Sequence, residues 1–231
     1  MKIHKLQIYS DNIKEQLRFY RDQLNLHITD YSEDHFEVET GYSTIKFQQK
    51  ENTTAYHIAF HIPDRQQKEA LEWVKERVPV LEGNGQEIVD FMAWNAKSLY
   101  FYDEDKNIIE FISRESFSKP ESALFSEKSI LGISEVGLVT ENIQEKFDFL
   151  NSNFQLEKYD GDFEHFCAIG DDEGLLITIN QKLKDWFPTD DKAYKSEFKI
   201  EFTHQGKKNS LVFENEYRRK DQAITRRITP P

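Results

Sequence analysis

The same helical stripe occurs in two parts of the chain that are far apart. Apolar side chains recur at offsets 0, 4, 7 and 11 from residue 13 and again from residue 143, as Ile13, Leu17, Tyr20, Leu24 and Ile143, Phe147, Leu150, Phe154. This spacing keeps the side chains on one face of an α-helix. A strand-like alternation precedes each helix, and β-rich sequence follows it. Such a repeat constrains the fold strongly, because each copy must bury the same face.

Alternating sequence marks the start of four segments. They begin near Ile3, Tyr56, Ile133 and Phe198. The first three continue into a helix pattern, with polar caps such as Asn142, whereas the fourth has no helix pattern between its two strands. The sequence therefore predicts an α+β fold of repeated βαβββ modules, three of them full and a fourth truncated.

The order of the segments suggests how the chain is divided. We expect a first module pair at 1–115 and a second, truncated pair at 129–215. Residues 116–128 are rich in Ser, Lys, Pro and Glu, which is typical of a linker. Residues 216–231 are basic and have almost no apolar content, which predicts a mobile tail.

Charge and cysteine content exclude several classes of protein. The formal net charge of -12 repels nucleic acid and anionic membranes, so we expect neither as a partner. Cys167 is the only cysteine, and a disulfide within the chain is impossible. The sequence opens on a strand pattern without a signal peptide or an apolar span, so the expected compartment is the cytoplasm. The sequence contains no glycine-rich phosphate loop and no nucleophile elbow.

Two stretches resemble the vicinal oxygen chelate superfamily, which includes glyoxalase I, extradiol dioxygenases, and the fosfomycin and bleomycin resistance proteins. Residues 57–64 read His-Ile-Ala-Phe-His-Ile-Pro-Asp, similar to the family's opening strand with its leading metal-binding histidine. Residues 94–111 resemble the closing hairpin, with Glu104 and Lys106 replacing the family's proline and glycine in the turn. The resemblance implies modules that pair into curled, cup-like mixed sheets around a small-molecule site.

Alternation also predicts which side chains face the cup of the first pair. One set packs on the helices, and the other lines the cup. Trp94 and Tyr100, beside the closing hairpin, are predicted to wall a ligand pocket. The polar set that we expect to bind a small-molecule ligand or a metal is Lys5, Gln7, Tyr9, Lys46, Gln48, His57, His61 and Glu110.

The resemblance implies a divalent metal, one of Zn, Ni, Fe or Mn, held by about four groups from the opening and closing strands. His57 and Glu110 occupy two of these positions, and Glu110 could also act as the catalytic base. Lys5 and Lys46 occupy the other two, and an ammonium cannot coordinate a metal. Three interpretations stay open: a metal site, a metal-free ligand site in which Glu110 pairs with Lys5 or Lys46, and a neutral pair without a ligand.

The second pair offers a poorer site, with Glu135 and Thr178 at its cup positions. We expect it to be structural, a lid or the surface of a homodimer. Three functions therefore compete: a metal-dependent lyase or dioxygenase of unassigned substrate, a metal-free small-molecule binding protein of the resistance type, and an interaction module.

Overall fold

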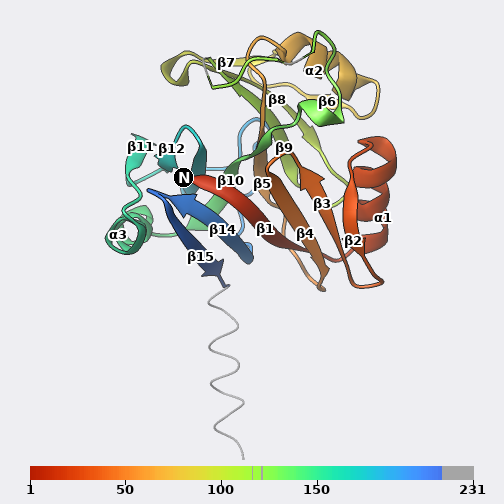
Figure 1. Ribbon diagram of the computed structural model, residues 1–231. Helices are drawn as coiled ribbons and strands as arrows, with labels where there is room; N and C mark the ends of the chain where they lie inside the picture. Colours follow the sequence, from red (N-terminus) through yellow and green to blue (C-terminus); the bar gives the residue numbers. More distant parts are fainter. Residues whose placement is uncertain (116, 121, 215–231) are drawn as a thin grey trace, which may run out of the picture.

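The computed structural model describes residues 1–115, 117–120 and 122–214 (Figure 1). The predicted basic tail at 216–231 lies outside these residues. The first segment contains β1 (Lys2–Ser10), α1 (Ile13–Arg18), a π-helical turn (Phe19–Gln23), β2 (Ile28–Tyr31), β3 (His35–Thr40) and β4 (Ser43–Gln49). In β1, Leu6 and Ile8 are fully buried, as their alternation predicts, and Ile3 is buried as well, beyond a register shift between Ile3 and Lys5.

The second and third segments also begin with a strand and a helix, and the helix is followed by four strands in the second segment and by three in the third. The second contains β5 (His57–Ile62), α2 (Gln67–Lys75), β6 (Val80–Leu81), β7 (Val89–Phe91), a 3-10 turn (Met92–Trp94), β8 (Ala96–Tyr102) and β9 (Ile108–Arg114). A second 3-10 turn (Glu127–Ser129) leads to β10 (Gly132–Thr140), α3 (Ile143–Phe154), β11 (Lys158–Gly161), β12 (Phe166–Asp171) and β13 (Gly174–Asn180). The side chain of Asn142 accepts from the backbone N–H of Glu145 and caps α3. The last strands are β14 (Phe198–His204) and β15 (Lys207–Phe213).

The strands form two mixed sheets, so the predicted α+β class is confirmed. Sheet A has the order β15-β14-β1-β4-β3-β2, and sheet B has the order β11-β12-β13-β10-β5-β9-β8-β6, with β7 paired to β8. Within each of the first three segments the first and last strands are parallel neighbours. Between segments the pairs are antiparallel, β1 with β14 and β5 with β10.

This pairing differs from the predicted one. We expected the first segment to pair with the second, whereas sheet A joins the first segment to the fourth and sheet B joins the second to the third. Alternation shows which face of a strand is buried, but it carries no information about the neighbour along the edge. Neither sheet is strongly curled (Figure 1), and sheet B is an open row with β11 and β6 as its outer strands.

One apolar core joins the two sheets and the helices. It contains side chains from both sheets together with Ala70 and Val74 of α2 and Ile143 and Leu150 of α3. Burying each large apolar side chain of this kind contributes about 1.5–3 kcal/mol. The opposite face of sheet B carries a separate cluster around Tyr100, Ile177 and Trp186. In the described part of the chain, no helix is both long and apolar enough to cross a membrane.

Candidate functional site

A cavity of about 410 Å³ lies on the face of sheet B that is turned away from α2 and α3. Its floor is formed by side chains of β5, β9, β10 and β13, among them His57, Glu110, Glu135 and Ile177. Aromatic rings form its walls, on one side from the segment around Trp94 and on the other from the loop that follows β13. The site therefore belongs to the second and third segments.

The floor is organised by strand register. Tyr100, Glu110, Ala59, Glu135 and Leu175 are neighbours in one row across β8, β9, β5, β10 and β13. Ala59 separates the two glutamates, and its methyl group leaves space above the sheet into which longer side chains can extend. Both glutamates are only 3% exposed. Two carboxylates are thus held close together under the cavity.

His57 and Glu110 form a buried pair. The Nε2 atom of His57 lies 2.9 Å from Oε2 of Glu110, and the histidine is 6% exposed. This hydrogen bond joins the imidazole directly to the carboxyl group. The other ring nitrogen, Nδ1, is buried and finds no hydrogen-bond partner among the described residues.

Arg114 neutralises the second glutamate. Its Nη2 atom donates to Oε1 of Glu135 at 2.6 Å, and both side chains are 3% exposed. The guanidinium lies over the rings of Trp94 and Tyr159, at 5.4 Å and 5.8 Å from their centroids. Burial and the nearby charge of Glu110 raise the pKa of Glu135, and Arg114 opposes that rise.

The loop after β13 brings two aromatic rings over the floor. The ring of Trp186 lies 5.1 Å from that of His57, and Phe187 meets Tyr100 edge to face at 5.6 Å. Trp186 can approach this closely because residue 137 is glycine: a Cβ atom there would lie 2.6 Å from the indole. The hydroxyl of Tyr102 donates to Asp191 at 2.5 Å and fixes the loop to β8.

The opposite wall is built around Trp94. Its indole N–H donates to Asp160 at 2.5 Å, and its ring stacks with that of Phe166 at 6.3 Å. Tyr100 completes the floor beneath Phe187, and burial together with the charge of Glu110 raises its pKa. The structure therefore places the predicted residues Trp94, Tyr100, His57 and Glu110 around one cavity, while their roles stay predictions.

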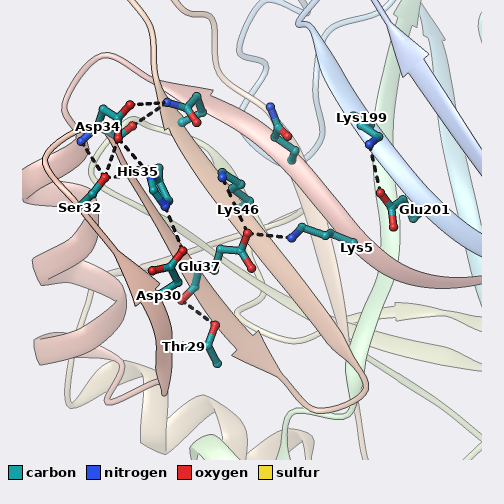
Figure 2. Close-up of polar contacts among 12 residues, drawn as sticks. Lys5, Thr29, Asp30, Ser32, Asp34, His35, Glu37, Lys46, Lys199 and Glu201 are labelled. Atoms are coloured by element: carbon teal, nitrogen blue, oxygen red, sulfur yellow. Dashed lines mark hydrogen bonds and ion pairs between the residues drawn. The ribbon is translucent and has the colours of Figure 1, made fainter.

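The structure contradicts the predicted partnership of Glu110 with lysine. Lys5 and Lys46 lie on sheet A, where their Nζ atoms are 2.7 Å and 3.9 Å from Oε1 of Glu37 (Figure 2). Their carboxylate partner is therefore Glu37 on β3, opposite Lys46 in the strand register. Lys5 and Lys46 lie away from Glu110 because the first segment pairs with the fourth and not with the second.

The remaining predicted ligand-binding residues also lie outside the cavity. On sheet A, Gln7 donates to the Tyr9 hydroxyl at 3.5 Å, and Gln48 donates to the carbonyl of Asp34 at 2.9 Å. His61 is on β5 but is fully buried, with its ring stacked on Phe117 at 4.1 Å. Burial and the charge of Arg114 lower the pKa of His61 to about 3. Gln7, Tyr9 and Gln48 thus lie on the other sheet from His57, which contradicts the predicted shared cup, whereas His61 shares the strand of His57 but is not part of the cavity lining.

Sequence reasoning placed Glu135 in a separate structural half and did not identify Arg114 or Trp186. Glu135 lies on the opening strand of the third segment, and its position in the alternation was the signal that could have found it. Arg114 ends β9 on the same face as Glu110, but its long side chain crosses to another strand. Thr178, predicted to face the cup, is fully buried beside Cys167 on the helix side.

These residues do not fit the metal that the resemblance implies. Nε2 of His57 and Oε2 of Glu110 bind each other, and Glu135 is held by a guanidinium. The fourth strand position is apolar, because β13 presents Ile177 and Ile179 to the cavity. No group of three or more His, Cys, Asp or Glu is arranged to hold a metal ion anywhere in the described ranges. With Glu135 held by Arg114, only His57 and Glu110 are left as metal ligands, and two ligands are too few for a stable site.

Comparison with solved structures identifies the fold. The chain matches the crystal structure of a "putative dioxygenase" from Bacillus subtilis subsp. subtilis str. 168 with a TM-score of 0.60 and 13% identity, over 100% of this chain and 97% of that chain. A glyoxalase/bleomycin resistance protein/dioxygenase from Alicyclobacillus acidocaldarius matches with a TM-score of 0.42 and 12% identity, over 50% of this chain and 92% of that chain.

A lactoylglutathione lyase from Agrobacterium tumefaciens matches with a TM-score of 0.40 and 17% identity, over 48% of this chain and 92% of that chain. No protein-family model and no curated protein sequence matches the chain. The match to the "putative dioxygenase", which extends over nearly the full length of both chains, shows that the two proteins share a fold.

Proposed function

We propose that this chain, which shares the fold of the glyoxalase, bleomycin resistance and dioxygenase proteins, binds a small aromatic molecule in the sheet B cavity without a metal. The observation that carries the proposal is the cavity itself, about 410 Å³ with aromatic walls above a buried polar floor. Ligand pockets have this size and this combination of apolar walls with a few fixed polar groups.

The polar floor supplies the orientation in this proposal. The His57–Glu110 pair is held by a direct hydrogen bond, and the Glu135–Arg114 pair is held in the same way. Both pairs come from strands of one sheet, so their positions are rigid before a ligand arrives. A catalytic role for Glu110 stays a prediction, as does a homodimer.

Filling the cavity tests the proposal. Ile177→Trp should occupy the floor, whereas Val212→Trp adds the same ring on β15, at a site that is 59% exposed and away from the cavity. Calorimetric titration with naphthalenemethanol, naphthalenemethylamine and naphthoate measures binding. We expect the wild type and Val212→Trp to bind at least one of these compounds equally well, and Ile177→Trp to lose at least about tenfold in affinity. The proposal is contradicted if neither the wild type nor Val212→Trp binds any of these compounds. It is also contradicted if Ile177→Trp binds them as tightly as the wild type does.

Metal analysis tests the metal-free part. Protein purified without chelator and then supplied with Zn, Ni, Fe(II) or Mn should retain far less than one equivalent after dialysis, because only two donors are available. Retention of about one equivalent that is lost in a His57→Ala, Glu110→Ala double variant would show that a metal does bind there.

A further inference from the structure

We infer that the molecule bound in this cavity is an organic cation, an amine attached to an aromatic group, whose ammonium lies against the floor formed by His57, Glu110 and Glu135. The inference rests on the proposed function, because it names the chemical class of the ligand for the same cavity.

Hydrogen-bonding capacity at the floor points to a donor-rich ligand. The carboxylates of Glu110 and Glu135, when ionised, only accept hydrogen bonds. His57 adds a further polar atom, since its Nε2 is hydrogen-bonded to Glu110 and its Nδ1 is left without a partner among the described residues. An ammonium carries three donors and no acceptor, so it complements such a floor, whereas a carboxylate ligand would place acceptors against acceptors.

The charge balance favours the same class. Four carboxylates line the cavity, on Glu110, Glu135, Asp160 and Asp185, together with Lys184, and Asp185 is paired with Lys192 at 2.6 Å. Arg114 lies beside the lining and balances only Glu135. The whole chain carries a formal net charge of -12, which attracts cations to the mouth and repels anions. A bound ammonium would relieve the repulsion between the two buried glutamates.

The walls attract cations as well. The negative faces of aromatic rings stabilise an ammonium within about 6 Å of the ring centroid, and the effect grows when the site excludes water. Two rings of the cavity already hold cations of the protein in this way: Lys184 lies 5.5 Å from the centroid of Phe166, and Arg114 lies 5.4 Å from that of Trp94. Trp186 faces the floor from the other side, over His57.

Three isosteric probes test the charge class. Naphthalenemethylamine, naphthalenemethanol and naphthoate are titrated calorimetrically at pH 7 and low salt. We expect the amine to bind at least about tenfold more tightly than the alcohol, and naphthoate to bind more weakly than either. Glu110→Gln and Glu135→Gln should each lower the affinity for the amine about tenfold and change that for the alcohol less than about twofold.

Glu201→Gln is the matched control, because this glutamate is exposed on sheet A next to Lys199. It should leave the binding of all three probes unchanged. Glu135→Gln removes the partner of a buried guanidinium, so its fold is checked by circular dichroism, and Glu110→Gln provides the test if the former unfolds.

The outcomes separate the two proposals. If the amine and the alcohol bind equally and Ile177→Trp abolishes both, the cavity is a binding site but the inferred charge class is wrong. Tighter binding of naphthoate, or an amine preference that survives Glu110→Gln and Glu135→Gln, also overturns the inference. If none of the probes binds the wild type, both proposals fall.

Discussion

Because Gly137 has no Cβ atom, the indole of Trp186 can lie close to the ring of His57. Gly137→Ala would place a Cβ atom 2.6 Å and 2.9 Å from two carbons of that indole, so Trp186 or the strand must shift. We expect the free energy of unfolding to fall by roughly 1–3 kcal/mol, because overpacking a closed contact has this cost. Denaturant unfolding measures it, and tryptophan fluorescence reports the displacement of Trp186.

The control is the same substitution in a Trp186→Ala background. Removing the indole removes the two closest contacts, so Gly137→Ala should then cost less than about 1 kcal/mol. Equal costs in the two backgrounds would show that Trp186 does not pack against Gly137 as described.

At this scale, the sequence predicts a side chain's position well only where a regular strand fixes its direction. Alternation put His57 and Glu110 on one face, and the structure shows them in contact. It could not predict the Arg114–Glu135 pair, because their strands are not adjacent and the bond depends on which segments share a sheet. Trp186 lies in a loop, where periodicity carries no information.

Among the elements, the turn between β8 and β9 is fastened to the first helix by one carboxylate. Oδ2 of Asp103 accepts from Nε2 of Gln16 at 2.8 Å, from the hydroxyl of Tyr20 at 3.0 Å and from Nδ2 of Asn107 at 2.8 Å. Burial outweighs these hydrogen bonds and raises the pKa of Asp103 to about 6. This contact joins the second segment to the first, although the two segments belong to different sheets.

Asp103→Asn should destabilise this junction. An amide nitrogen in place of Oδ2 would face three donors, so we expect a loss of roughly 2–4 kcal/mol in the free energy of unfolding at pH 5. In the wild type the raised pKa contributes stability that is fully present below the unfolded-state value near 4 and is lost as the pH rises through about 6.

The stability difference between wild type and variant should therefore shrink between pH 4 and pH 7, by up to about 3 kcal/mol. Urea unfolding at a series of pH values measures it. A difference that grows with pH would mean that the carboxylate is stabilised in its charged form.

The first helix shows how far its pattern reaches. Apolar spacing predicted one continuous helical stripe from residue 13 to residue 24, and the structure has an α-helix to Arg18 followed by a π-helical turn. Leu17, expected in the core, is only partly buried. Gln16 is fully buried, and its side chain donates a hydrogen bond to Asp103. Glutamine is usually exposed, so the burial of Gln16 against a partner far away in the sequence could not be predicted from its residue type.

For the whole molecule, the pairing of segments decides which fragments can fold. A chain that ends at residue 115 would retain β1 without β14 and β5 without β10, and both strands would expose an unpaired edge. We expect such a fragment to lack cooperative thermal unfolding by circular dichroism. A chain that ends at residue 214 keeps every described strand and should unfold like the full chain. Cooperative unfolding of residues 1–115 near the melting temperature of the full chain would support the consecutive pairing that the sequence suggested.

Sheet A is completed by β14 and β15, so it can form only after these two strands have been synthesised. The hydrogen bond between His4 and Thr203 joins residues 199 positions apart. On the ribosome, every described strand of sheet B emerges before β14. The edge of β1 that pairs with β14 therefore stays unpaired throughout this interval, although β1 emerges before the other described strands. Pairing across so long a separation is slow, since the ordering cost precedes the contact. A nascent chain that stalls in this interval would offer the open edge of β1 to other chains.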